Sequence, residues 1–221
     1  MCCNLYVIPS VTHTLLQTVE RKVSYEEVVV TEVTPEGSFF VQTIAEGPKA
    51  EALNAKLRQE FQANPPLPGA YTPKRGDVCA AKYTVDDEWY RVKVEKVQGG
   101  KATVHYFDYC NRETLPTTRL DTMPAAYVGE KPYATEYVLP YVSLPKDDEF
   151  SAMAIKYLRE DTAVSKLLLN VEYRVQGTPP AASLHVDSTS EGDIVMNLIT
   201  EGLLLVENRK ERRQNKLVSG V

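Results

Sequence analysis

Residues that could bind a transition metal or build a disulfide framework are scarce in this chain. Among its 221 residues there are only 4 cysteines and 3 histidines. They are Cys2, Cys3, Cys79 and Cys110, and His13, His105 and His185. No CxxC pair occurs and the histidines are scattered, so the spacing matches no zinc site. We therefore expect no metal, no cofactor and free thiols, as in a reducing compartment.

Long apolar segments are also lacking. No run approaches the roughly 20 residues that a membrane-spanning helix needs, and the N-terminus lacks a basic region followed by an apolar stretch and a cleavage site. We expect an intracellular chain without a membrane partner. Its opening residues show no structural pattern, so we expect residues 1–24 to be a linker or cloning sequence, and the chain to be a piece of a longer protein.

An excess of positive charge is the third absence. With 25 basic and 30 acidic residues, the chain has a formal charge of -5, so bulk electrostatics do not favour nucleic-acid binding. The charges are unevenly distributed. A basic tail occupies residues 209–221, whereas Asp86, Asp87 and Glu88 form an acidic group in mid-chain. The tail could contact phosphate, although a solvated chain end is the simpler interpretation.

The part of the chain before residue 70 predicts a β-hairpin followed by one helix. Segments 28–33 and 38–44 are rich in β-branched and aromatic residues, and a Pro-Glu-Gly turn separates them. In segment 48–64, large apolar residues recur every four positions among strong helix formers. The Pro-Pro-Leu-Pro-Gly sequence at 65–69 cannot continue a helix and predicts a module boundary.

Short strands dominate the next segment, 74–124. We predict strands at 78–83, 89–97 and 101–109, with a Gln-Gly-Gly turn before the last of them. The run TTRLDTMPAAY can then supply a closing strand or turn. Five short strands in about 50 residues suit a small barrel whose closure removes exposed edges.

Beyond residue 132 strands and helices alternate. The predicted elements are a strand over 133–144 interrupted by Pro140, a helix over 147–159, a hairpin over 166–175 and 183–186, a short helix over 194–199 and an apolar run over 203–206. The apolar face of the longer helix is expected to carry Phe150, Ala154, Tyr157 and Leu158.

Neither flank of the central segment has enough strands to close a sheet. The simplest arrangement is therefore one β-rich domain, split in sequence, with the 74–124 barrel inserted between its halves. The expected divisions are 1–24 (linker), 25–64 (first half of the split domain with a linking helix), 74–124 (inserted barrel), 132–208 (second half) and 209–221 (basic tail).

Aromatic residues are concentrated in the inserted segment. They are Tyr83, Trp89, Tyr90, Tyr106, Phe107 and Tyr109. Side chains alternate between the two faces of a strand, so one member of each adjacent pair can fill the core. If Trp89 and Phe107 pack inward, the four tyrosines can converge at the rim and line a pocket. Ring faces attract a methylated cation by about 0.5–2 kcal/mol each. The alternative is that they are ordinary half-buried strand residues.

Two stretches of this segment carry a family resemblance. AKYTVDDEWYRVKVEKV and VHYFDYCNRETLP resemble the Tudor family core, in which an EWYRA-like strand precedes a YxDYGN turn. The wider match, from about Val28 to Arg209, resembles the Tudor-SN family, including GAYTPKRGDVCAAKY, TRLDTMP, ATEYV and DIVMNLITEGLLLVE. The resemblance implies a mainly β fold, in which a Tudor SH3-like barrel is inserted into a split staphylococcal-nuclease-like (SN-like) OB-fold.

The same resemblance implies a methylarginine-binding site. The family's aromatic cage falls on Tyr83, Tyr90, Tyr106 and Tyr109, and Asn111 is the polar residue expected to hydrogen-bond the guanidinium. Cys110 stands where the family usually has glycine, so a positive φ at that position would strain the cysteine. Arg91 and Asp108 are expected to form an ion pair that steadies the sheet, and the acidic group at 86–88 is expected to attract an arginine-rich peptide.

The resemblance further implies a reader of symmetrically dimethylated arginine in a protein of RNA silencing, RNA processing and transcription co-activation. Expected partners are arginine-methylated proteins, Argonaute/Piwi-like or carrying Sm-like Arg-Gly-rich tails, and RNA; the expected location is the cytoplasm and also the nucleus. The alternatives are a single-stranded RNA-binding module or a calcium-dependent ribonuclease fragment.

We expect no catalysis by this chain, because no calcium-binding set with ordered arginines can be assembled from its acids. The acids considered are Glu26, Glu27, Glu32, Glu36, Asp187, Glu191 and Asp193. In the family, nuclease activity would lie in other SN-like repeats of the parent protein.

Overall fold

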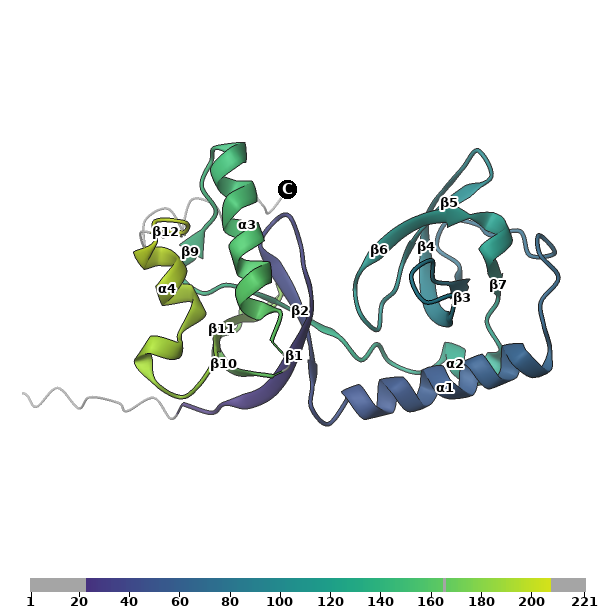
Figure 1. The fold of residues 1–221 in the computed structure, drawn as a ribbon, viewed down its shortest axis with the longest axis horizontal. Coiled ribbons are helices and arrows are strands. Elements are labelled where there is room, and N and C mark those ends of the chain that lie inside the picture. The colour runs from purple at the N-terminus through teal and green to yellow at the C-terminus, as the bar shows by residue number, and fades with distance from the viewer. Residues whose placement is uncertain (1–22, 165, 208–221) are drawn as a thin grey trace, which may run out of the picture.

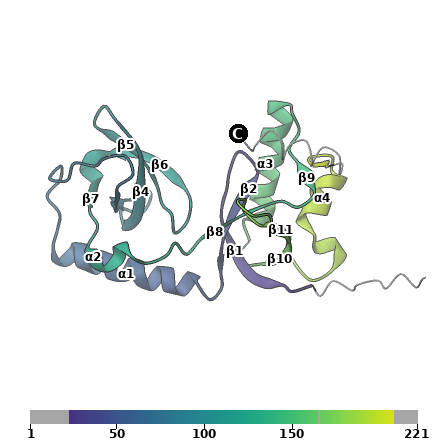
Figure 2. The ribbon, with the colours of Figure 1, turned by 180° about the vertical axis from the view of Figure 1, so that it is seen from behind.

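The structure, a computed structural model, describes residues 23–164 and 166–207. Two β-rich units lie side by side, and Figure 2 shows the same pair from behind. The predicted linker and basic tail lie outside the described residues, except for Val23 and Ser24. Within the described part, no helix is both long and apolar enough to cross a membrane.

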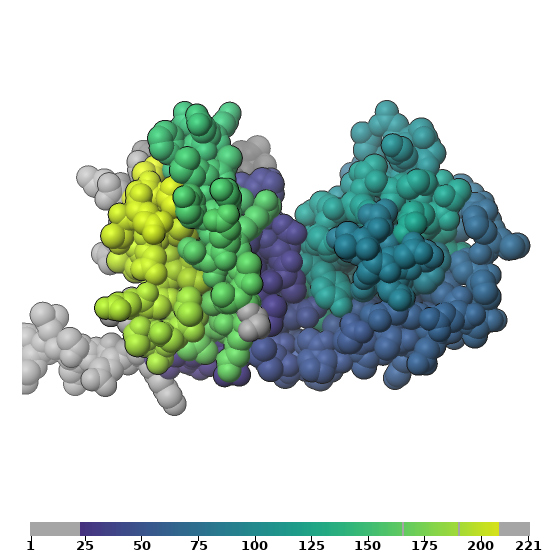
Figure 3. All heavy atoms as spheres, in the orientation of Figure 1, coloured from purple at the N-terminus to yellow at the C-terminus, as the bar shows by residue number. Residues whose placement is uncertain are grey.

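We call the two units the split barrel, residues 23–46 and 133–207, and the inserted unit, residues 47–132. In Figure 1 the split barrel is on the left and the inserted unit on the right, with helix α1 (Gly47–Ala63) along its base. The space-filling view shows two bodies that meet along one side (Figure 3).

Strands from both ends of the described chain form the split barrel. It is closed in the order β1-β10-β11-β8-β2. Its strands are β1 (Glu26–Val33), β2 (Ser38–Thr43), β8 (Thr135–Val138), β10 (Leu167–Tyr173) and β11 (Ala181–His185). Two precede the inserted unit and three follow it, so neither group could close alone. The predicted split domain is confirmed, and its core joins Val28 and Phe39 of the first half to Leu167 and Leu184 of the second.

Helices and a small ribbon complete the split barrel. They are α3 (Asp148–Thr162), the 3-10 turn η2 (Ser190–Gly192), α4 (Ile194–Thr200) and the paired strands β9 (Val142–Ser143) and β12 (Leu205–Val206). Asp147 caps α3 by accepting from the backbone N–H groups of Glu149 and Phe150. The predicted helices at 147–159 and 194–199 are thereby confirmed.

The predicted apolar face of α3 is half wrong. Ala154 and Leu158 are buried, as expected, together with Ile155, but Phe150 is 56% exposed and Tyr157 is 40% exposed. At about 100° per residue, the buried stripe is centred between positions 154, 155 and 158, which puts residue 157 at its margin. Phe150 belongs to the first turn, where the helix contributes no buried residue.

The inserted unit contains a five-stranded sheet in the order β6-β5-β4-β3-β7. The strands are β3 (Val78–Lys82), β4 (Trp89–Gln98), β5 (Lys101–His105), β6 (Arg112–Pro116) and β7 (Leu120–Thr122), with the 3-10 turn η1 (Thr117–Arg119) and helix α2 (Ala125–Val128) after β6 and β7. The five predicted strands are present. In the described part the edge strands β6 and β7 are joined through η1 and not by ladder hydrogen bonds, so the expected closure by pairing is wrong.

Strand β5 ends four residues earlier than predicted. The backbone N–H groups of Tyr109 and Cys110 both donate to the carbonyl oxygen of Tyr106, at 2.9 and 2.5 Å, which forms a tight turn. This turn places the aromatic run after β5 at the end of the sheet and not along a strand edge.

Helix α1 packs on the outside of the five-stranded sheet. Its residues Leu57 and Phe61 form a small core with Ala80 and Met123, and the Phe61 ring stacks on Trp89 with centroids 4.3 Å apart. Trp89 therefore covers the outer face of the sheet. The expectation that Trp89 fills the barrel core is wrong, because α1 makes this outer face a second buried surface.

Candidate functional site

Four tyrosine rings meet at one end of the sheet. The Tyr83 and Tyr106 centroids are 5.1 Å apart, and Tyr90 lies 6.1 Å from each of them and 5.8 Å from Tyr109. All four contacts are edge-to-face, the geometry that aromatic quadrupoles favour. In the described part of the chain Tyr83 and Tyr109 make no ring contact with each other, so they stand at opposite ends of the group.

The rings differ in depth. Tyr106 is only 2% exposed and belongs to the sheet's core with Val92, Val104 and Leu115, whereas the other three tyrosines are half-buried. The sequence predicted all four rings at the rim. Tyr106 instead forms the floor of the group.

Phe107 also differs from the expectation that it fills the core. Its ring lies outside the sheet, 4.9 Å from the guanidinium carbon of Arg91. Alternation along the strand correctly placed Phe107 and Tyr106 on opposite faces, but the side that faces the core is the one occupied by Tyr106.

Three of the four ring hydroxyls have fixed polar partners. Tyr90 donates to Asp86 Oδ2 at 2.5 Å, Tyr106 donates to Glu113 Oε2 at 2.8 Å, and Tyr109 accepts from Asn54 Nδ2 of α1 at 3.0 Å. Burial raises the pKa of all three phenols, and the carboxylates raise the pKa values of Tyr90 and Tyr106 further. The hydroxyls therefore stay protonated at neutral pH and hold the ring planes in place.

Glu113 and Asn54 were not identified from the sequence. Asn54 lies 55 residues before Tyr109, and only the packing of α1 on the sheet brings the two together. Glu113 could have been suspected, because it lies on the strand that follows the aromatic turn, but no local pattern distinguishes it from other strand carboxylates.

Arg91 and Asp108 form the predicted ion pair, and both are almost fully buried. Arg91 Nη2 and Nε donate to the two carboxylate oxygens at 2.6 and 2.9 Å. The guanidinium also donates to the carbonyl oxygens of Tyr127, Glu130 and Lys131 at 2.9–3.2 Å. Such bidentate, fully satisfied geometry is what a buried arginine requires.

This ion pair connects the tyrosine group to the split barrel. Asp108 lies in the aromatic turn beside Tyr109, and its carbonyl oxygen accepts from the buried side chain of Gln42 on β2 at 2.7 Å. Its carboxylate also accepts from the backbone N–H of Tyr133 at 3.3 Å. The turn is thus held from both units of the protein.

Asn111 lies at the end of the same turn. Its carbonyl oxygen accepts from the backbone N–H of Tyr106 at 3.0 Å. No side chain in the described residues forms a hydrogen bond with the Asn111 amide group, which leaves that amide available to a ligand. Its predicted contact with a guanidinium stays a prediction.

Cys110 has a positive φ of 70°, as expected for a position where the family usually has glycine. Its side chain is buried, Sγ lies 3.6 Å from the carbonyl oxygen of Phe107, and burial raises the pKa of the thiol to about 12. The cysteine is therefore a protonated, unreactive residue in a conformation that costs a non-glycine residue free energy.

A pair of substitutions isolates this backbone cost. Cys110→Ala and Cys110→Gly both remove the sulfur, but only alanine keeps a Cβ at the positive φ. We expect the glycine variant to unfold with a free energy about 1 kcal/mol higher than that of the alanine variant. Urea denaturation of both proteins measures this difference, and a more stable alanine variant would show that the position carries no strain.

The acidic group at 86–88 is partly neutralised by the protein itself. Asp87 pairs with Lys82 at 2.5 Å and with Arg119 at 2.7 Å, and these hydrogen bonds lower its pKa. Glu88 lies 3.8 Å from Arg58 of α1. In the described residues Asp86 forms no ion pair; it accepts only from Tyr90 and from the backbone N–H of Glu88.

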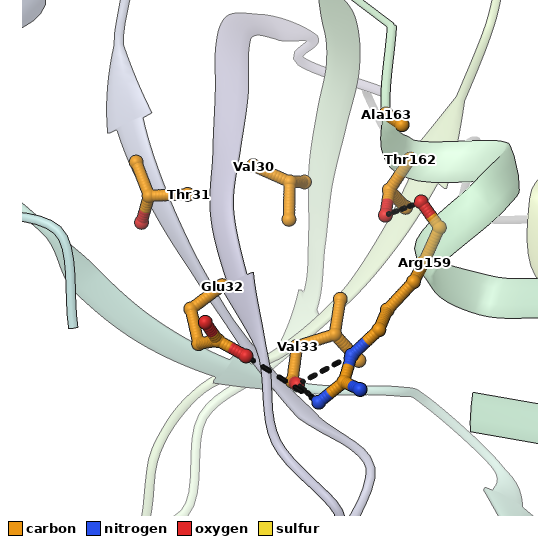
Figure 4. Close-up of a pocket in the computed structure, with 7 residues that line it drawn as sticks. All are labelled: Val30, Thr31, Glu32, Val33, Arg159, Thr162 and Ala163. Atoms are coloured by element: carbon orange, nitrogen blue, oxygen red, sulfur yellow. Dashed lines mark hydrogen bonds and ion pairs between the residues drawn. The ribbon is translucent and has the colours of Figure 1, made fainter. Parts of the chain in front are cut away.

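A separate hollow of about 490 Å³ lies on the split barrel (Figure 4). Arg159 of α3 reaches across it and donates to the Val33 carbonyl oxygen from Nε and Nη2, at 3.1 and 2.6 Å. Nη2 also lies 3.5 Å from Glu32. These contacts fix α3 to the end of β1, so the arginine is engaged in holding the barrel together.

The remaining candidate nuclease acids also have structural contacts. Glu27 pairs with Lys166, Asp187 accepts from Thr189 and Asp193 caps α4. In the described part of the chain, no group of three or more histidine, cysteine or acidic residues is arranged to hold a metal ion.

A small curved sheet with four converging tyrosines at one end defines an aromatic-cage module of the Tudor type. The Tudor domain profile matches residues 20–141, and the chain belongs to the Tudor domain family. The chain is 52% identical to "Staphylococcal nuclease domain-containing protein 1" of Drosophila melanogaster over 90% of its own length and 21% of that protein. It thus spans about a fifth of this relative.

Solved structures agree with this assignment. The extended Tudor domain of Drosophila melanogaster Tudor-SN (p100) superposes with a TM-score of 0.79 at 51% identity, over 89% of this chain and 91% of that one. The human TDRD1 extended Tudor domain, solved with a symmetrically dimethylated peptide, gives 0.72 at 26% identity, over 84% and 91%. The predicted resemblance to the extended Tudor region of Tudor-SN is confirmed.

Proposed function

We propose that this chain is a reader of arginine methylation that binds symmetrically dimethylated arginine in a peptide. The convergence of Tyr83, Tyr90, Tyr106 and Tyr109 within 5.1–6.1 Å of their neighbours carries the proposal. A planar methylated guanidinium fits between the two end rings, Tyr83 and Tyr109, with Tyr90 and Tyr106 beneath it. The human TDRD1 domain, which shares the fold, was solved with such a peptide.

The physical basis is the balance between desolvation and ring contact. Methylation removes two N–H groups from water, so a dimethylated guanidinium loses less hydration on entering an apolar cage than an unmodified one. Each ring face then contributes about 0.5–2 kcal/mol. The Asn111 amide is placed to accept from one of the remaining N–H groups, which fixes the orientation of the ligand.

The proposed partners are arginine-methylated proteins, Argonaute/Piwi-like or with Sm-like Arg-Gly-rich tails. In the longer protein, the module would contribute to RNA silencing, RNA processing and transcription co-activation, in the cytoplasm and the nucleus. Binding of peptides is favoured over RNA binding, because the chain is acidic overall and carboxylates, rather than lysines or arginines, contact the tyrosine hydroxyls. We propose that the chain acts by binding and not by catalysis.

Nuclear magnetic resonance with the free amino acid symmetric dimethylarginine tests where the ligand binds. We expect shift changes at the four cage tyrosines and Asn111, and none in β1 or β10 of the split barrel. Shifts confined to the split barrel would contradict the proposal.

A further inference from the structure

Five carboxylates of the inserted unit lie around the tyrosine cage, and they differ in how their charge is compensated. Asp108 is paired with Arg91, Asp87 with Lys82 and Arg119, and Glu88 lies near Arg58. The remaining two are Asp86 and Glu113. In the described part of the chain neither of these forms an ion pair with a lysine, arginine or histidine.

These two carboxylates are also the ones that contact cage hydroxyls. Asp86 Oδ2 lies 2.5 Å from the Tyr90 oxygen and Glu113 Oε2 lies 2.8 Å from the Tyr106 oxygen. The other Glu113 oxygen accepts from the Thr84 hydroxyl. Each tyrosine therefore joins one uncompensated negative charge to the ring that would face the ligand.

A hydroxyl that donates to a carboxylate makes its ring richer in electrons, which strengthens the attraction of that ring for a cation. The raised pKa values of Tyr90 and Tyr106 agree with this arrangement. The negative charges also act directly on a ligand in the cage, since the half-buried surroundings screen them less than water does.

We propose that Asp86 and Glu113 are the counter-charges of the cage: they position Tyr90 and Tyr106 and supply the negative potential that binds the cationic ligand. This inference rests on the proposed methylarginine function. It distinguishes the two carboxylates from Glu88, which belongs to the same turn as Asp86 but lies near Arg58 of α1 and contacts no cage hydroxyl.

The test is calorimetric titration of the whole chain with a peptide that carries one symmetrically dimethylated arginine. Asp86→Asn and Glu113→Gln keep an oxygen acceptor for the tyrosine but remove the charge. We expect each to weaken binding about three- to tenfold. Glu88→Gln is the matched control and is expected to change the affinity by less than about twofold.

Salt dependence supplies a second measurement that a folding defect would not imitate. Wild-type affinity should fall as sodium chloride rises, and the fall should be shallower in both charge-removing variants. Wild-type binding that is insensitive to salt, or equal affinities for the wild type and both variants, would overturn this inference and leave the methylarginine proposal standing. A wild-type chain with no preference for the methylated peptide would overturn both.

Discussion

Replacement of Arg91 by methionine is expected to lower the free energy of unfolding by about 3–5 kcal/mol, the cost of removing one partner of a buried ion pair. Methionine has a similar length, but it leaves the Asp108 carboxylate buried without its partner. It also removes the donors to the carbonyl oxygens of Tyr127, Glu130 and Lys131. Urea denaturation followed by circular dichroism measures the loss.

Arg112→Met is the matched control for this prediction. Arg112 also pairs with a carboxylate on the same sheet, Glu95 at 3.0 Å, but its side chain is 50% exposed. Exposed pairs contribute about 0–1 kcal/mol, so this variant should unfold almost like the wild type. Similar losses for both variants would contradict a special role of the buried pair.

Arg91→Met should also weaken methylarginine binding, because Asp108 fixes the turn that carries Tyr109. The expected route is geometric, through the position of the turn, since the Arg91 guanidinium lies beneath Phe107 and Tyr133 and outside the cage.

Removal of the end rings should abolish binding of the methylated peptide. Tyr83→Leu and Tyr109→Leu each remove one ring face at about 0.5–2 kcal/mol, so we expect each to weaken binding about 2- to 30-fold and the double variant to bind too weakly to measure. Tyr109→Phe keeps the ring face and removes only the contact with Asn54, so it should bind nearly as tightly as the wild type. Leucine variants that bind within twofold of the wild type would contradict the cage.

Tyr106 is a poor choice for this experiment, although its position in the cage is central. Its ring is 2% exposed and fills the sheet's core, so Tyr106→Ala should cost about 3–5 kcal/mol of stability. A loss of binding in that variant would not separate a missing cage wall from an unfolded sheet.

Local patterns were enough to predict most of the elements of this fold. Strand alternation, the Pro-Glu-Gly turn and the Gln-Gly-Gly turn identified the hairpins, and the count of strands on each flank predicted the split barrel. The four cage tyrosines came from strand alternation together with family resemblance. The positive φ of Cys110 followed from the usual glycine at that position.

The missed features depend on contacts between distant segments. Alternation shows that Trp89 and Tyr90 face opposite sides, but it cannot show which side is the core when α1 covers the outer face as well. Asn54 and Glu113 acquire their roles only through packing, as does the triple carbonyl contact of Arg91. The same limit explains the half-wrong face of α3, because Phe150 and Tyr157 are apolar residues that the fold leaves exposed.

The central claim is that the tyrosine cage distinguishes methylated from unmodified arginine. Calorimetric titration of the wild-type chain with peptides that differ only in one arginine, unmodified, monomethylated, asymmetrically dimethylated or symmetrically dimethylated, tests it most directly. The account predicts that the symmetrically dimethylated peptide binds tightest, about tenfold or more above the unmodified one, as expected if several ring contacts gain from methylation. Equal affinity for all four peptides would contradict it.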